Sequence, residues 1–378
     1  MAKQYGEEQV GYVVAESTLG VAVVPAATDA HRCSSFDITP NYDRHEVPET
    51  RNTRSLQERV AGRKSANFAI ELVNRPSGTA GTPPDYHDYL RQAFGTYTNN
   101  ASTSDVYTLL KDPSALFLSG YRLLEGILEG YRGGVVQNVT FAWGGDQFGT
   151  VSIAGKAVDM LWAGTDAANG TGSSATSLIV DKGGMYSQYA IIEIAGAASA
   201  LQVTAHDGSN TLTIASSSWS DGDAITPYLP SPTLAGSPLY GTVGSLSLDG
   251  GSSTIAHISG SMSMETGMDT HDREFGSAVP TGIVLPQRRG VTFNLSFVIE
   301  DDGNYETLRG KAANGTAQNI QLNIGTTGGQ ICRIEMPKAE LDLPAISGGA
   351  GLVECSISGT AMTSATTAKE DELTLTYL

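Results

Sequence analysis

The stretch "GRKSANFAIELVNRPSG", residues 62–78, and the stretch "QRRGVTFNLSFVIEDDG", residues 287–303, follow one pattern. Each contains a basic pair, and each continues with alternating apolar and polar residues from Phe68 or from Phe293. Such alternation is typical of a β-strand with one buried face. Placing Phe68 over Phe293 superposes the apolar positions that follow. We therefore predict two equivalent strands.

Further matches occur in the same order along the chain. "YHDYLRQAFG" (86–95) corresponds to "NYETLRGKA" (304–312), and both predict a short helix after the strand. "VSIAGKAV" (151–158) corresponds to "CSISGTAM" (355–362), and they share the pattern Ser-Ile-x-Gly-x-Ala. Chance is a poor explanation for several collinear matches. The sequence therefore predicts a tandem duplication of one β-rich domain.

One segment, "ALFLSGYRLLEGILEGYRGG" (115–134), is compatible with an amphipathic helix by its leucine spacing. The second copy has "NIQLNIGTTGGQICRIEM" (319–336) at this place, which favours only a hairpin. Because the copies are expected to match, we predict strand–turn–strand in both.

The expected architecture is all-β, with one short helix per repeat. Its predicted parts are a first domain at residues 1–164, a small inserted β-domain at 165–232 and a second domain at 233–378. The insert opens with "GTDAANGTGSSATS", which predicts a flexible tether and an outward-projecting unit. Inside the insert we expect a hairpin with its turn at Asp207-Gly208.

Composition limits the possible functions of the 378-residue chain. The formal net charge of −17 repels polyphosphate and argues against tight binding of nucleic acid. Three cysteines without a CxxC motif favour buried free thiols over a disulfide framework or a zinc site. No signal peptide is visible, and no uncharged apolar run approaches the ~18 residues of a membrane helix. These features predict a soluble protein made in the cytoplasm.

The sequence contains no arrangement of residues typical of an enzyme. The G-x-S-x-G, P-loop and H-E-x-x-H patterns are all missing, and the six histidines are scattered. "DTHDRE" (269–274) brings together groups that can bind metals, but an ionic loop facing solvent or a partner is the favoured interpretation. We therefore expect no catalytic residue, no metal and no cofactor.

Two charged, proline-containing segments, 43–61 and 267–286, precede the basic pairs. Structureless loops of this length are usually functional. Their candidate contact residues are Arg44, His45, Glu46, Glu49, Arg51, Arg54, Asp269, Asp272, Arg273 and Glu274. The basic pairs themselves are Arg63, Lys64, Arg288 and Arg289. We expect these pairs to form salt bridges with the acidic loops across an interface rather than to bind phosphate.

The predicted strands also have a polar face. Its residues are Asn67, Ala69 and Glu71 in the first copy and Thr292, Asn294 and Ser296 in the second. A face of small polar residues contacts water rather than a packed partner. It is either an ordinary outer sheet surface or the lining of a channel.

The segment "GYVVAESTLG" (11–20), together with the repeated blocks, resembles the tail tube (major tail) proteins of long-tailed bacteriophages. That resemblance covers both repeated domains but not the insert. It implies β-sandwich domains with a flanking helix, six of which form a ring whose inner sheets join around a lumen. Two domains per chain then imply a trimer with pseudo-sixfold symmetry. The long charged loops would clasp neighbouring subunits.

The same resemblance implies a virion protein whose rings stack into a tube that conducts DNA to the host. Implied partners are other copies of the chain, the tape measure, tail tip and tail terminator proteins, and DNA in transient, non-specific passage. A membrane is not implied, and assembly is expected in the host cytoplasm. Asn67, Glu71, Thr292, Asn294 and Ser296 would face the lumen.

The alternative is a β-adhesin or carbohydrate-binding module. In that case the insert would supply aromatic stacking surfaces. Candidate residues for stacking are Tyr186, Tyr189, Trp219 and Tyr228, which we otherwise expect to fill the small core of the insert.

Overall fold

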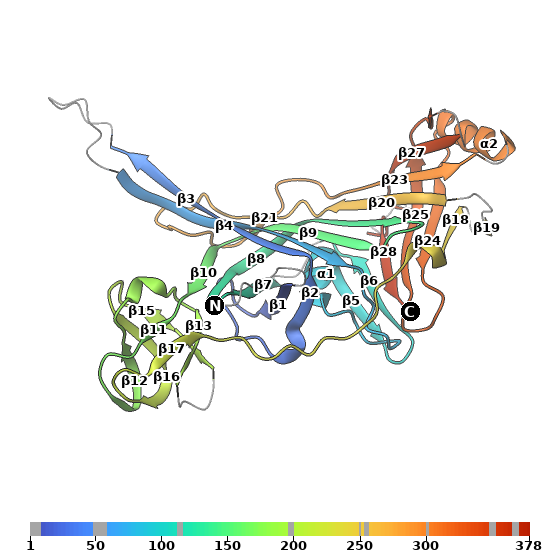
Figure 1. The fold of residues 1–378 in the computed structure, drawn as a ribbon. Helices are drawn as coiled ribbons and strands as arrows, with labels where there is room; N and C mark the ends of the chain where they lie inside the picture. Colours follow the sequence, from blue (N-terminus) through green and yellow to red (C-terminus); the bar gives the residue numbers. More distant parts are fainter. Residues whose placement is uncertain are drawn as a thin grey trace.

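The computed structural model describes residues 9–47, 59–111, 116–195, 200–248, 251–252, 257–299, 302–347, 353–364 and 370–378. Strands dominate these residues, so the all-β prediction is confirmed. The molecule is elongated, with a long sheet across its middle (Figure 1). A hairpin whose described end is residues 43–46 and 59–61 projects from one end of the molecule, and we call it the arm. Within the described residues, no helix has the length and apolar character needed to cross a membrane.

The elements fall into three groups along the chain. The first group is β1 (Gln9–Glu16), β2 (Ala30–Cys33), β3 (Ser35–Glu46), β4 (Arg59–Val73), α1 (His87–Phe94), β5 (Gly95–Asn100), β6 (Ser104–Leu109), β7 (Phe117–Leu124), β8 (Ile127–Gly144), β9 (Thr150–Ala157) and β10 (Asp159–Ala163). The middle group is β11 (Asp166–Ala167), β12 (Gly172–Ile179), β13 (Ile191–Ile194), β14 (Leu201–Gln202), β15 (Ala205–His206), β16 (Thr211–Trp219) and β17 (Ala224–Pro227). The last group is β18 (Gly244–Leu248), β19 (Gly251–Ser252), β20 (His257–Glu265), β21 (Asp269–Thr270), β22 (Ile283–Val284), β23 (Gly290–Val298), α2 (Asp302–Ala313), β24 (Gln318–Ile324), β25 (Cys332–Leu341), β26 (Ala345–Ser347), β27 (Glu354–Ala361) and β28 (Thr374–Tyr377).

One long sheet contains strands from both halves, in the order β3-β4-β9-β8-β20-β23-β27-β26. The two halves meet where β8 pairs with β20 in antiparallel register, Phe141 opposite Met262. Both of these side chains are buried in a core that continues through both halves. The halves are therefore joined edge to edge by a backbone ladder as well as by side-chain packing.

The two basic-pair strands occupy the same place in their halves. Phe68 on β4 lies opposite Gly155 on β9, and Phe293 on β23 lies opposite Gly359 on β27. A Cβ added at Gly155 would lie 2.4 Å from a ring carbon of Phe68, and one at Gly359 would lie 2.5 Å from a ring carbon of Phe293. The shared Ser-Ile-x-Gly-x-Ala pattern thus has a packing reason, because its glycine accommodates the phenylalanine ring.

Other elements correspond in the same way. The predicted hairpin in residues 115–134 is β7–β8, which turns at Glu125 and Gly126 with positive φ at both. Its counterpart is the hairpin β24–β25. After the closing strands β9 and β27, β10 returns to pair with β8, and β28 returns to pair with β25. β10 and β28, together with the strands they pair with, form a second layer in each half. Helix α1 packs against the second layer of the first half.

The insert forms two small sheets, ordered β11-β17-β13-β14 and β12-β16-β15. The predicted hairpin is present as β15–β16, and the Asp207 carboxylate accepts hydrogen bonds from the N–H groups of Ser209 and Thr211. The predicted flexible tether is wrong, because residues 164–177 contain β11 and most of β12. Their backbone groups pair with β17 and β16, which a free tether could not do. The division at 165–232 itself stays a prediction.

We expect Gly155→Ala and Gly359→Ala to lower the free energy of unfolding by similar amounts, about 1–3 kcal/mol each. In both variants the new methyl group would displace a buried phenylalanine ring and a backbone carbonyl. Denaturant titration of purified protein measures the effect. Gly290→Ala is the matched control, because a Cβ there meets nothing within 4 Å. Equal stability of all three variants would contradict the packing explanation.

Candidate functional site

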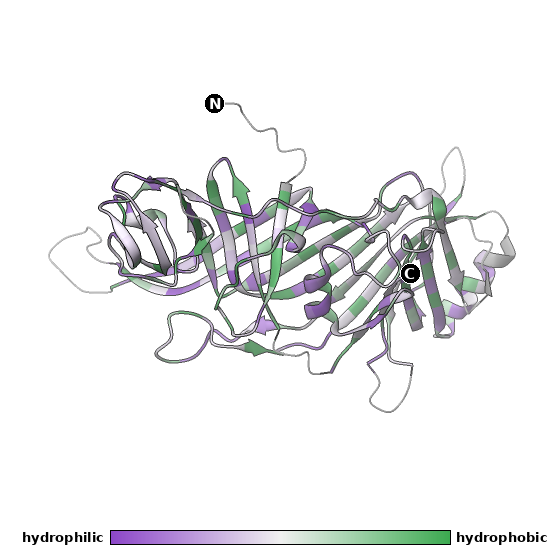
Figure 2. Ribbon diagram, turned by 90° about the horizontal axis from the view of Figure 1, so that it is seen from below, coloured by the Kyte–Doolittle hydropathy of each residue, from purple (hydrophilic) through white to green (hydrophobic). Residues whose placement is uncertain are grey.

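The polar strand face is solvent-exposed in both halves. Asn67 and Glu71 on β4, and Thr292 and Asn294 on β23, are exposed, while Ser296 is half-buried. Ala69 is exposed on the same face, and the alternate residues Phe68, Ile70, Phe293 and Leu295 are buried in the core. Figure 2 shows the resulting alternation of hydrophilic and hydrophobic bands along the strands. The sequence therefore placed the two faces of these strands correctly.

Register continues this face across the joint between the halves. Cross-strand neighbours place residues of six strands in one row: Glu71, Ser152, Thr140, Ser263, Thr292 and Thr360. At the joint, the hydroxyl groups of Thr140 and Ser263 lie 2.9 Å apart, and the Asn138 amide donates to Ser263. Five of the six residues bear a small hydroxyl group, and the row continues from one half to the other across the joint.

The segment that connects β20 to β23, residues 266–289, lies across the first half of its own chain. We call it the strap. The Thr266 hydroxyl donates to the Val136 carbonyl at 2.8 Å, and the Lys64 N–H donates to the Ala278 carbonyl at 2.9 Å. The strands β21 and β22 pair within the strap. The expectation of a structureless loop is therefore wrong for this segment.

Lys156 on β9 holds the acidic part of the strap. Its ammonium nitrogen lies 3.4 Å from an Asp269 carboxylate oxygen and 3.3 Å from one of Asp272. Burial alone would raise the pKa of Asp272, but the hydrogen bond and charge of Lys156 outweigh it and hold that pKa below its usual value. No local pattern in the sequence pointed to Lys156, because it lies more than a hundred positions away from its partners.

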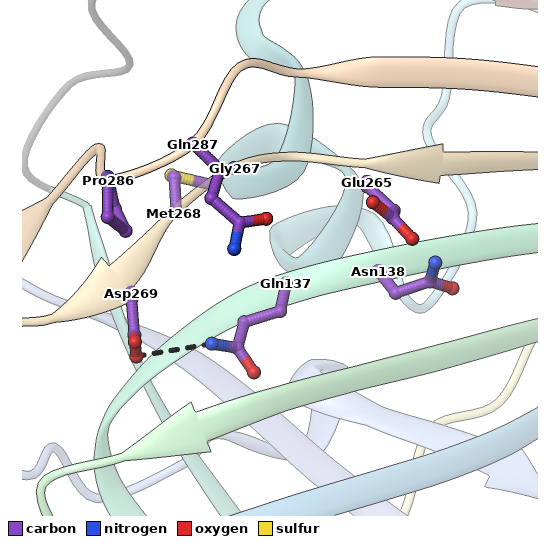
Figure 3. Close-up of a pocket in the computed structure, with 8 residues that line it drawn as sticks. All are labelled: Gln137, Asn138, Glu265, Gly267, Met268, Asp269, Pro286 and Gln287. Carbon is purple, nitrogen blue, oxygen red and sulfur yellow. Dashed lines mark hydrogen bonds between the residues drawn. The ribbon is translucent and has the colours of Figure 1, made fainter.

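Between the strap and the joint lies a pocket of about 260 Å³. It is lined by Gln137, Asn138, Glu265, Gly267, Met268, Asp269, Pro286 and Gln287 (Figure 3). The Gln137 amide donates to Asp269 at 3.2 Å. Within the part of the chain that the structure describes, no three His, Cys, Asp or Glu side chains are placed to hold a metal ion.

Within the chain, the two basic pairs contact groups other than the acidic loop side chains with which salt bridges were expected. Arg63 donates to the backbone carbonyl of Glu274 at 3.1 Å, and the Lys64 ammonium lies over the Tyr42 ring. Arg289 pairs with Glu370 and Glu372 near the C-terminus. Arg288 and Arg273 are exposed. Contacts of these residues between subunits stay predictions.

The first charged segment, 43–61, is the end of the hairpin arm rather than a loop where it is described. Arg44 lies opposite Ala61, His45 opposite Val60 and Glu46 opposite Arg59. Glu46 and Arg59 form an ion pair of 2.9 Å across the hairpin. The candidates Glu49, Arg51 and Arg54 lie outside the described residues.

The insert aromatics do not form the stacking surface of a carbohydrate site. Tyr186 and Trp219 are only 2% and 6% exposed and belong to the core of the insert. The Arg132 guanidinium lies over the Tyr189 ring, 5.2 Å from its centroid. Tyr228 packs against the same core.

The long sheet ends in two edges that have no strand partner among the described residues. One is the outer edge of β3, which corresponds to β20 because Ile38 faces Phe68 as Met262 faces Phe293. The other is β26, which lies beside β27 as the last part of β8 lies beside β9. Thus the β3 and β26 edges correspond to the two strands that pair with each other at the internal joint.

Exposure of apolar residues marks the β26 edge. Ile346 faces Cys355 in the way that Phe141 faces Val151, yet Ile346 is 52% exposed and Phe141 only 1%. Leu343 beside it is also exposed. The difference arises because β20 covers Phe141, whereas no described strand covers Ile346.

The chain was compared with models of known protein families. The model of a family described as phage tail tube protein matches residues 6–361. A search of curated proteins found no match. The matched range contains the polar sheet face, the strap, the insert and both open edges.

We expect Lys156→Met to loosen the strap and to accelerate tryptic cleavage after the exposed Arg273 about two- to fivefold, the effect of losing contacts worth under about 1 kcal/mol each. Mass spectrometry of the fragments over time measures the rate. Lys111→Met, which changes an exposed lysine elsewhere, is the control. Unchanged cleavage at low salt would mean that Lys156 does not hold the strap.

Proposed function

Because this chain belongs to the phage tail tube protein family, we propose that it closes into rings through its open sheet edges and that the rings stack into a DNA-conducting tube. Family membership makes it a structural protein of the phage tail. The joint between β8 and β20 supports the rest of the proposal, because it is an internal example of the contact that the open edges require.

In the proposed joint between chains, β3 of one copy lies on β26 of the next as β20 lies on β8. Ile346 and Leu343 would then be covered as Phe141 is covered within the chain. A strand edge left open is an aggregation hazard, and closure of a ring removes it. Each open edge carries a proline, Pro40 on β3 and Pro344 before β26. Proline lacks an N–H donor, so it limits pairing in wrong registers.

The proposed number of chains combines the six domains per ring that the resemblance implies with the two equivalent halves of each chain. Each chain contributes two equivalent basic-pair strands, at Phe68 and Phe293, with matching partners. A ring of six such units therefore takes three chains and has pseudo-sixfold symmetry. Head-to-tail contacts between rings extend the assembly into a tube. The tape measure, tail tip and tail terminator proteins are the partners proposed at its ends.

The polar face is the proposed lining of the tube. Its exposed residues Asn67, Thr292 and Asn294 are small and uncharged, Ser296 is half-buried, and Glu71 adds negative charge. Lys156, opposite Asn67 on the same face, is already paired with Asp269 and Asp272. Such a surface would hold DNA phosphates only weakly, so the DNA would slide.

The arm and the strap are the proposed clasps. The strap already crosses from the second half onto the first, held by Lys156. The arm, where it is described, consists of the ends of β3 and β4, residues 43–46 and 59–61, which project beyond the sheet at the corresponding place in the first half (Figure 1). We propose that the arm makes the same crossing onto a neighbouring chain.

We expect Ile346→Lys to abolish rings and tubes while leaving the melting temperature within about 2 °C of the parent, since a surface substitution costs little stability. The charge would be buried without a partner at the joint between chains. Negative-stain micrographs and sedimentation measure assembly. Ile179→Lys, at a comparably exposed position on the insert, is the control. Normal tubes from Ile346→Lys would exclude β26 from the joint.

We expect Asn294→Arg to leave tubes intact but to raise their DNA affinity at least about tenfold at low salt, because three or more added cations would contact phosphates. Co-sedimentation with labelled DNA measures binding, and Ser216→Arg on the insert surface is the control. If parent tubes bind DNA as tightly as the variant, the face does not line the passage.

A further inference from the structure

The joint between the two halves has a second layer. The hairpin β5–β6 of the first half extends over the second half, where β6 pairs with the C-terminal strand β28. Thr108 lies opposite Thr374 and Asp105 opposite Tyr377. The halves are thus joined twice within one chain, by β8–β20 in one layer and by β6–β28 in the other.

The second half has no hairpin that corresponds to β5–β6 and could pair with the next chain. In the first half, residues 95–116 between α1 and β7 contain β5 and β6. In the second half only residues 314–317 separate α2 from β24. The strand that would receive a hairpin is β10, which pairs with β8 as β28 pairs with β25. Its outer edge would therefore stay open in a joint between chains.

The insert covers the C-terminal end of that edge. The Ser187 N–H donates to the Trp162 carbonyl at 2.9 Å, and the Gly164 N–H donates to the Met185 carbonyl at 3.1 Å. The Trp162 N–H donates to the Ser187 hydroxyl at 2.8 Å. The outward-pointing backbone groups at this end of β10 are thus satisfied by residues 185–187.

The insert is packed firmly enough to act as a cover. Its buried residues share one core with Tyr12, Tyr121 and Leu128 of the first half. The Gln202 amide donates to the Ala22 carbonyl at 2.8 Å, which adds a polar anchor. In Figure 1 the insert lies beside the end of β10, below the arm.

We infer that the insert is an edge cap: it occupies the outer edge of β10 and so prevents β10 from pairing with β10 of a second copy. The inference rests on the proposed function. With the cap in place, joints between chains use only the two open edges of the long sheet, β3 and β26. In the ring, each joint within a chain then has two layers of paired strands, and each joint between chains has one. The cap also prevents lateral association of neighbouring tubes.

The test replaces residues 165–232 by a flexible Gly/Ser linker. The parent is expected to form regular tubes, and the linker variant irregular, laterally joined multimers. Trp162→Pro in the linker background should restore regular tubes, because it removes an outward donor of β10 that the ladder with β8 does not use. Regular tubes from the linker variant alone would overturn the inference. A parent without rings or tubes would instead refute the proposed function.

The Trp162→Pro variant separates pairing at the β10 edge from other causes of association. Removing the insert also uncovers Tyr12, Tyr121 and Leu128. If these apolar residues cause the association, Trp162→Pro will not restore regular tubes, and the inference fails.

A variant of the full chain tests the cap even if the linker variant does not fold. Ser187→Ala removes the hydroxyl that accepts from Trp162 N–H. Amide exchange in residues 159–164 should then rise about fivefold, the effect of one hydrogen bond. Ser216→Ala is the control, and equal exchange in both variants would overturn the inference.

Discussion

The whole structure depends on the need of strand edges for hydrogen-bonding partners. Each half alone would expose a ladder of unpaired N–H and C=O groups, which costs free energy if buried and invites aggregation if exposed. The chain satisfies one such edge internally, where β8 meets β20. This internal pairing leaves two edges open at opposite ends of the long sheet. They are β3, which corresponds to β20, and β26, which corresponds to the last part of β8. A repeated contact between identical chains is the simplest way to satisfy them.

The face of the sheet obeys a second constraint, the two-residue period of the strand. One side packs into a core continuous through both halves, in which the Phe68 and Phe293 rings sit against glycines. The other side carries small hydroxyl and amide groups. Because the period holds across the joint, the polar surface continues from one half to the other without a step. A polar surface whose Lys156 is paired with Asp269 and Asp272 would suit the proposed passage of a polyanion better than its capture.

The two halves differ where their surroundings differ. The first half carries the β5–β6 hairpin and the insert, and the second half carries the strap. The hairpin reinforces the joint within the chain, and the insert covers the place where an equivalent reinforcement between chains would attach. The repeat supplies the common geometry, whereas these additions make the internal joint different from the proposed external one.

By itself the sequence determined the strands around Phe68 and Phe293, their inner and outer faces, the helices after them and the hairpin in residues 115–134. It did so because these features follow from local periodicity and from agreement between two copies. Only the tertiary structure decided that Lys156 holds the strap, that residues 44–46 and 59–61 of the charged segment extend a hairpin, and that the tract at 164–177 is built into the insert. The physical reason is that each of these depends on pairing between segments distant along the chain. Alternation shows which face of a strand is buried but not which other strand lies beside it.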